Sequence, residues 1–188
     1  ELDGKQGRAP DSHQRLPRCG PGPAEVAHPV RHHRRGLGHL AVIAGDDGRA
    51  DRRLHAFEQA ARAAGLPAVR SVRVPAPTTL KSGREALAQL LDAGKPLQGV
   101  FCSSDLLALG VLTEARARKL DVPGQLSLVG FGDLEFAADL EPSLTTVRID
   151  GQAIGRQAAR FIIDRAEGRT PTATVVDVGF QIIERASA

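Results

Sequence analysis

Short apolar runs alternate with helix-length segments over residues 37–188, and this alternation constrains the fold more than any other feature. Runs typical of strands cover residues 40–44, 69–74, 99–102, 126–130 and 175–183, the last interrupted at Gly179. Segments with apolar residues at helical spacing cover residues 50–64, 78–91, 106–120 and 151–166. Because crossover helices join parallel strands, we predict an α/β fold with a parallel sheet and helices on both faces.

The segment predicted to form the last helix, residues 151–166, carries a clear apolar face. This face holds Ile154, Ala158, Phe161 and Ile162. An apolar stripe on a helix normally packs against the core of its own domain. We therefore expect these four side chains to point inward.

Residues 1–36 differ from the rest in composition. They hold seven of the 25 Lys and Arg against four of the 22 Asp and Glu, so the net charge of +3 belongs to this segment. Its few apolar residues follow no period, which predicts an irregular basic segment ahead of one domain over 37–188. His28 and His32 have helical spacing, but Pro29 argues against a helix, and zinc needs three or four ligands. No metal site is predicted.

Several function classes leave no trace in the sequence. It has no run of eighteen apolar residues, no basic and apolar leader, no phosphate-binding glycine loop and no Gly-x-Ser-x-Gly motif. We therefore predict a cytoplasmic protein without a membrane span, a cofactor or an enzymatic activity. In parallel sheets ligands bind beyond the carboxyl ends of the strands, so the turns at 45–53, 102–105 and 130–135 are where a site is expected.

These turns lie in motifs of a known family. The motifs are VFCSSDLLALG at 100–110, LDVPGQLSLVGFGD at 120–133 and PSLTTVR at 142–148. With Gly38-His39 and the Arg-x-x-x-aromatic pattern of Arg53 to Phe57, they resemble the LacI/GalR family of bacterial transcriptional repressors. The resemblance covers residues 37–188 in order and at family spacing.

The resemblance implies the carboxy-terminal part of an effector-binding core, with a fold like that of periplasmic sugar-binding proteins of type I. The family's helix-turn-helix and most of its first subdomain are absent from this sequence, and residues 1–36 do not match the family. A shifted reading frame or a remnant would explain that difference. The implied partners are a small-molecule effector, operator DNA bound through the missing helix-turn-helix, and a second copy in a homodimer.

The motif Gly-Phe-Gly-Asp followed by PSLTTVR is similar to that of the gluconate-utilisation repressors. The effector implied is therefore a sugar or a gluconate-like sugar acid. A sugar-binding protein of a transport system would have the same fold and is the alternative. The absence of a secretory signal argues against it.

Arg53, Ser104 and Asp105 are the first three candidate ligand-binding residues. By resemblance Arg53 contacts the effector, and a guanidinium fork suits a carboxylate or sugar hydroxyls; the alternative is a solvated arginine. Ser104 stands where many relatives have a sugar-contacting Asn. Ser103, Ser104 and Asp105 also open a helix, so we expect one of them to cap it.

Phe131 and Asp133 complete the candidate set. Phe131 either lines the pocket or belongs to the core. Gly132 occupies the position where relatives that bind neutral sugars often have Asp, so the sequence favours an anionic effector. Asp133, one residue later, either faces the ligand or caps the following turn.

Two segments match the family's dimer interface. They are the helix from Leu106 and the loop 134–140, whose apolar residues stand among few charges. The predicted interface residues are Leu106, Leu109, Phe136 and Leu140. The alternative is that these side chains pack on their own domain.

Overall fold

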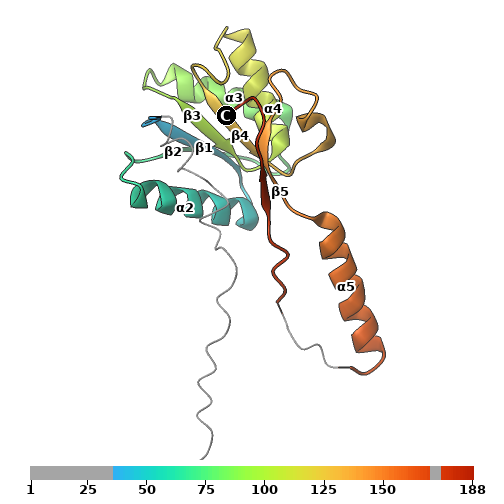
Figure 1. Cartoon of the computed structure of the whole chain (residues 1–188). Coiled ribbons are helices and arrows are strands. Elements are labelled where there is room, and N and C mark those ends of the chain that lie inside the picture. Colours follow the sequence, from blue (N-terminus) through green and yellow to red (C-terminus); the bar gives the residue numbers. More distant parts are fainter. Residues whose placement is uncertain (1–35, 170–174) are drawn as a thin grey trace, which may run out of the picture.

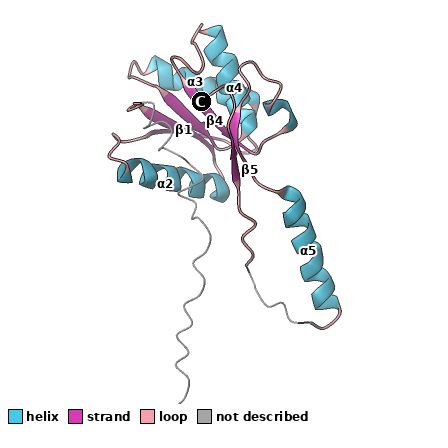
Figure 2. Cartoon of the chain, viewed as in Figure 1, coloured by secondary structure: helices cyan, strands magenta, loops and turns pink. Residues whose placement is uncertain are grey.

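The computed structural model describes residues 36–169 and 175–188 and shows an α/β architecture (Figures 1 and 2). The strands are β1 (Leu40–Gly45), β2 (Arg70–Val74), β3 (Gly99–Cys102), β4 (Ser127–Phe131), β5 (Thr145–Arg148) and β6 (Gln181–Ile183). The helices are α2 (Gly48–Ala63), α3 (Leu80–Asp92), α4 (Asp105–Ala117) and α5 (Gly151–Ala166), with a 3-10 turn η2 (Glu135–Ala137). Residues 1–35, which include most of the predicted basic segment and its histidines, lie outside the described residues.

One sheet holds these strands in the order β2-β1-β3-β4-β5-β6. Neighbouring strands from β2 to β5 are parallel, and β6 is antiparallel to β5. The predicted α/β class with a parallel sheet is confirmed. The short strand β5 was not predicted, because its four residues contain two threonines and no apolar run.

Helices cover both faces of the sheet, as expected. Figure 1 shows α2 on one face and α3 and α4 on the other. Leu54 and Phe57 of α2 pack with one side of β1, where Val42 points. Leu87 of α3 and Leu107 of α4 pack against the opposite side. Because both faces are covered, β1 is buried along its whole length, which explains its unbroken apolar sequence.

Short polar side chains fix where the helices begin. Asp47 accepts hydrogen bonds from the N–H groups of Arg49 and Ala50 at the start of α2. Thr79 and Ser82 form a reciprocal capping box at the start of α3. Each of the four helices begins after the carboxyl end of a strand: α2 after β1, α3 after β2, α4 after β3 and α5 after β5.

Helices α3 and α4 approach each other closely through two glycines. A Cβ atom on Gly83 would lie 2.3 Å from the carbonyl oxygen of Leu107, and one on Gly110 would lie 2.2 Å from that of Leu80. No larger side chain fits either position without moving a backbone. The pair therefore sets the spacing of the two helices on that face of the sheet.

Helix α5 corrects one expectation. The helix forms over residues 151–166, but none of its residues is buried. Ile154 is 48% exposed and Ile162 is 71% exposed, so these side chains do not point into a core. Figure 1 gives the reason, because α5 extends away from the sheet after β5. Among the helices of residues 36–169 and 175–188, none combines the length and apolar character needed to cross a membrane.

Candidate functional site

The carboxyl ends of β1, β3 and β4 meet at one edge of the sheet. A buried serine joins two of them, because the Gly45 N–H donates to Ser103 Oγ at 3.0 Å and the Ser103 N–H donates to the Ile43 carbonyl at 2.9 Å. Helices α2 and α4 begin directly after β1 and β3. The edge is therefore a rigid platform, and the predicted site residues lie around it.

Arg53 crosses this platform from α2. Its guanidinium carbon lies 3.7 Å from the centre of the Phe131 ring at the end of β4. Its Nη1 donates to the Ser103 carbonyl oxygen at 3.3 Å. Burial lowers the pKa of Arg53, and the Asp47 charge opposes that shift; an arginine stays charged at neutral pH. Arg53 is thus a fixed cation at the end of the strands rather than a freely solvated side chain.

Ser104 caps helix α4, which confirms the expectation that one of residues 103–105 would do so. Its Oγ accepts a hydrogen bond from the Leu107 N–H at 3.3 Å. The same oxygen lies 3.2 Å from Thr78 Oγ1. Ser104 is half-buried, so part of this residue reaches the surface of the platform.

Asp105 is fully buried, and its carboxylate is engaged within the fold. It accepts hydrogen bonds from the Thr146 hydroxyl at 2.6 Å and from the Leu134 N–H at 2.7 Å. Gly130 leaves room for it, since a Cβ there would lie 2.2 Å from the carboxylate. Burial raises the pKa of Asp105, against the hydrogen bonds that lower it. The residue joins β5 and the loop after β4 to the start of α4.

Asp133 binds two arginines that the sequence analysis did not single out. Arg185 donates to one carboxylate oxygen at 2.8 Å, and Arg148 donates to the other. Burial alone would raise the pKa of Asp133, but the bonds from Arg185 and Arg148 hold it below its usual value. The side chain does not cap the following turn η2. Asp133 instead connects the loop after β4 with the end of β5 and the segment after β6.

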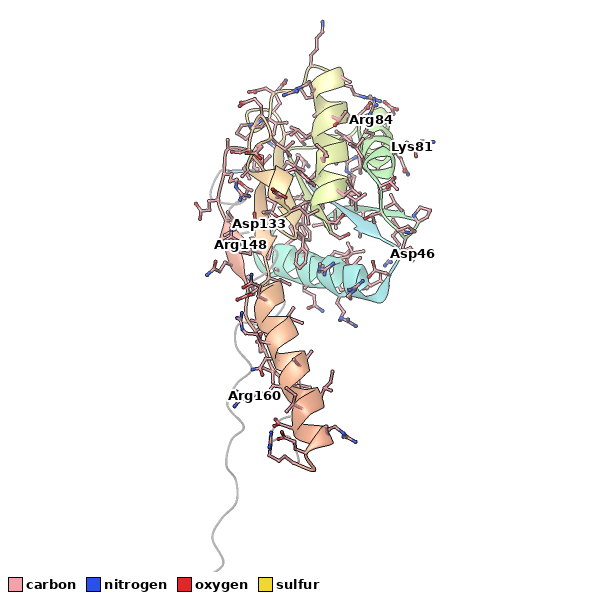
Figure 3. The ribbon with its side chains drawn as sticks, turned by 90° about the vertical axis from the view of Figure 1, so that its right-hand side faces the viewer. Asp46, Lys81, Arg84, Asp133, Arg148 and Arg160 are labelled. Carbon is pink, nitrogen blue, oxygen red and sulfur yellow. The ribbon has the colours of Figure 1, made fainter. Side chains whose placement is uncertain are left out.

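A cavity of about 810 Å³ opens beside this ion pair, whose Asp133 and Arg148 are labelled in Figure 3. Its lining includes Gly132, Asp133 and Arg148, the first turn of α5, and the chain leading into β6. Gly132, which lines the cavity, directly follows Phe131 in the chain. Arg148 and Arg185 were missed because their partner is distant in sequence; the position of Arg148 inside the PSLTTVR motif was the available signal.

The predicted dimer residues lie on helix α4 and around the turn η2. Leu106 and Leu109 are half-buried on α4, and Phe136 and Leu140 are half-buried around η2. Leu140 also packs against the core. Leu134, in the same loop, is 47% exposed. Among residues 36–169 and 175–188, no three or more His, Cys, Asp or Glu side chains come together as metal ligands would.

Comparison with known proteins identifies the class of protein. A family model described as "Periplasmic binding protein-like domain" matches residues 30–188. The regulator GntR of Pseudomonas aeruginosa is 34% identical over 156 residues, which are 81% of this chain and 45% of GntR. The repressor CytR of Escherichia coli is 35% identical over 117 residues, which are 62% of this chain and 34% of CytR.

Solved structures agree. The regulator CelR in complex with cellobiose superposes with a TM-score of 0.78 at 29% identity, over 89% of this chain and 51% of CelR. A LacI-family regulator from Corynebacterium glutamicum gives 0.78 at 27% identity, over 88% of this chain and 63% of its own. The chain belongs to the periplasmic binding protein-like domain family, and its expected likeness to the LacI-type repressors is confirmed. It spans about a third to a half of the length of these curated relatives.

Proposed function

We propose that this chain is the ligand-sensing part of a LacI-type transcriptional regulator whose effector is a gluconate-like sugar acid. The single observation that carries the proposal is Arg53, a charged fork fixed between the Phe131 ring and the Ser103 carbonyl at the carboxyl ends of the strands. A carboxylate is the group that such a fork binds best, through two parallel hydrogen bonds.

The neighbouring positions favour an anion over a neutral sugar. Gly132 has no side chain, and the carboxylates of Asp105 and Asp133 are already engaged by other groups of the fold. A free carboxylate at contact distance would repel an acidic ligand by about 1–4 kcal/mol, depending on the local dielectric. Ser104 keeps a hydroxyl at the platform for a sugar hydroxyl. In this proposal Arg53, Ser104 and Phe131 contact the ligand, whereas Asp105 and Asp133 hold the surrounding loops.

The regulatory role follows from the relatives. GntR and CytR are named as helix-turn-helix regulators, and CelR was solved with a sugar. We propose that effector binding here shifts the population of a cytoplasmic homodimer between states that hold and release operator DNA. The proposed dimer surface consists of Leu106, Leu109, Phe136 and Leu140. The relatives are regulators rather than enzymes or transport proteins, which favours this role over sugar transport.

Calorimetric titration of the chain with gluconate, 6-phosphogluconate, glucose and ribose tests the proposal. Both acids should bind more tightly than either neutral sugar. Arg53→Gln should weaken acid binding by about tenfold or more, because a charge-assisted hydrogen bond contributes about 1.5–3 kcal/mol. The matched control is Arg52→Gln, which removes the same charge from an exposed neighbour on α2.

Three results would reject the proposal. One is tighter binding of glucose or ribose than of either acid. The second is acid binding that survives in Arg53→Gln, and the third is acid binding that falls equally in Arg52→Gln. Equal losses would mean that α2 attracts anions only through its overall charge.

A further inference from the structure

The proposed function does not use the cavity beside Asp133. It lies where β5 passes the chain to α5 and where the chain returns in β6. Figure 3 shows Asp133 and Arg148 next to each other at this junction. Polar side chains on its wall include Arg148, Gln152 and Gln181. Its volume of about 810 Å³ falls within the range of small-molecule sites.

The charge around Asp133 is positive overall. One carboxylate is bound by two guanidinium groups, those of Arg148 and Arg185, which leaves a net charge of +1. Asp133 and Arg185 are 7% and 16% exposed at their side chains, whereas Arg148 is 48% exposed. The excess positive charge is therefore accessible at Arg148.

Arg148 also has donors to offer. It binds Asp133 through Nε, and among the described residues its two terminal amino groups have no hydrogen-bond partner. Those groups form one side of the guanidinium fork, the geometry that binds phosphate and carboxylate. Arg185 keeps Asp133 neutralised, so Arg148 can bind a second anion without leaving a bare buried charge.

One other carboxylate, that of Asp150, lines the cavity. It accepts a hydrogen bond from the Ala153 N–H at 2.8 Å and lies 3.8 Å from Arg156. Its charge is thus opposed by an arginine and by the amino-terminal end of α5, where the helix dipole is positive. Asp150 therefore does not cancel the charge that Arg148 presents.

We propose that this cavity is a second anion subsite, in which Arg148 binds a phosphate or carboxylate at the far end of the effector. This inference rests on the proposed function, in which Arg53 binds the acid group at the other end of the effector. Phe131 and Asp133, which contact the two arginines, are two residues apart, so their Cα atoms are separated by at most about 7 Å. The two contacts are therefore close along the chain, and in this proposal one six-carbon acid spans both arginines. The preferred ligand class is a sugar acid with an anion at each end.

Titration of the chain with inorganic phosphate, followed by NMR at constant ionic strength, tests the subsite alone. The Arg148 Nε–H signal and the amides of Gly151 and Gln152 should shift and saturate. Arg148→Gln should weaken this binding by about tenfold, the loss of a charge-assisted fork. Arg160→Gln is the matched control, because Arg160 lies farther along α5, away from Asp133 (Figure 3); it should change binding by less than about twofold, as an exposed and screened charge does.

Arg148→Gln should leave the pair between Asp133 and Arg185 intact, and circular dichroism checks that the variant folds. Arg148→Lys, which keeps the charge but not the fork, should retain part of the binding. Absence of a saturable shift at Arg148, or equal phosphate binding by the parent and Arg148→Gln, overturns the subsite.

A second titration links the two ends of the ligand. The parent should bind 6-phosphogluconate and the diacid glucarate about tenfold more tightly than gluconate, and Arg148→Gln should reduce both ratios to about two. If 6-phosphogluconate binds more tightly than gluconate but glucarate does not, the subsite is specific for phosphate. If phosphate titrates Arg148 but gluconate does not bind, the proposed function fails and the subsite stands. If both ratios persist in Arg148→Gln, the second anion binds elsewhere and the inference is wrong.

Discussion

Two regions of the molecule differ in what becomes of an apolar helix face. The sheet with α2, α3 and α4 is here called the body, and helix α5 is here called the arm. Both contain helices with an apolar face. In the body those faces are buried, and Leu87 and Leu107 are 0% exposed. In the arm Ile162 is 71% exposed. Amphipathic spacing therefore predicts that a helix will form, but the neighbouring elements decide whether its apolar face is buried.

The difference has an energetic consequence. An isolated helix of 16 residues is marginal in water, since most helical stability in proteins comes from packing an apolar face. The body has its own core on both sides of the sheet, so we expect its stability not to depend on the arm. We therefore expect matched substitutions in the two regions to give very different results.

The largest expected difference is between two phenylalanines. Phe57 stacks on Phe101 with ring centres 5.5 Å apart and is 2% exposed, whereas Phe161 lies half-buried on the arm. Phe57→Ala should lower the free energy of unfolding by about 3–5 kcal/mol, and Phe161→Ala by less than about 1 kcal/mol. Urea denaturation of both variants measures this. Equal losses would mean that the arm belongs to the same cooperative core.

Asp133 lies at the junction of the two regions and should give the next largest effect. Asp133→Asn removes a carboxylate that binds Arg148 and Arg185, and it should cost about 2–3 kcal/mol near pH 7. The folded state holds the pKa of Asp133 below its usual value, so the contribution is complete at neutral pH. The contribution of the Asp133 carboxylate to stability is lost as the pH falls below about 3.9, the pKa of an unfolded Asp, and through the lower pKa of Asp133 in the folded state. The parent and the variant should therefore converge in acid, which urea denaturation at several pH values measures; a gap that stays constant from pH 7 to pH 3 would contradict the charge pairing.

Replacing a glycine by alanine should lower stability in the body and raise it in the arm. Gly83→Ala places a Cβ against the Leu107 carbonyl and should destabilise the body by about 1–3 kcal/mol. Gly155→Ala meets nothing within 4 Å and should stabilise α5 by about 0.5–1 kcal/mol. Denaturation reports the first change, and the helical signal in circular dichroism reports the second. A loss of helix in Gly155→Ala would show that the arm packs closely against another surface.

Substitutions on the surfaces of the two regions should differ in their effect on self-association, with little change in stability. Phe136→Asp on the proposed dimer surface should reduce the sedimenting mass to that of a monomer and change the free energy of unfolding by less than about 1 kcal/mol. Ile162→Asp on the arm should leave the mass unchanged. The reverse result would place the contact between copies on the exposed face of α5.

The sequence predicted most of the body because its signals are local. The strand at 99–102 has the bounds that the pattern predicted, and Ser104 is the one of residues 103–105 that caps α4. The same local pattern predicted the bounds of the arm, residues 151–166, but not its exposure. The close packing of Gly83 and Gly110 could not be predicted, since a glycine in a helix does not reveal which backbone approaches it.

The site was only partly predictable for the same reason. Arg53 and Phe131 lie in recognisable motifs, and the structure brings them together. Asp133 binds Arg185, which is 52 positions away, and no local pattern records such a pair. The two roles of a carboxylate, binding a ligand or holding a loop, look alike in a sequence. Only the hydrogen bonds of the folded chain distinguish them.

The central claim is that the carboxyl-end platform of the body binds the effector. Amide hydrogen exchange of the chain with and without saturating gluconate tests it most directly. Binding at the platform should slow exchange at residues 45–53, 102–105 and 131–134 and leave the outer turns of α5 unchanged. Protection confined to the arm or to residues 58–69 at the other end of α2, or no protection by a gluconate concentration that saturates calorimetric binding, would contradict it.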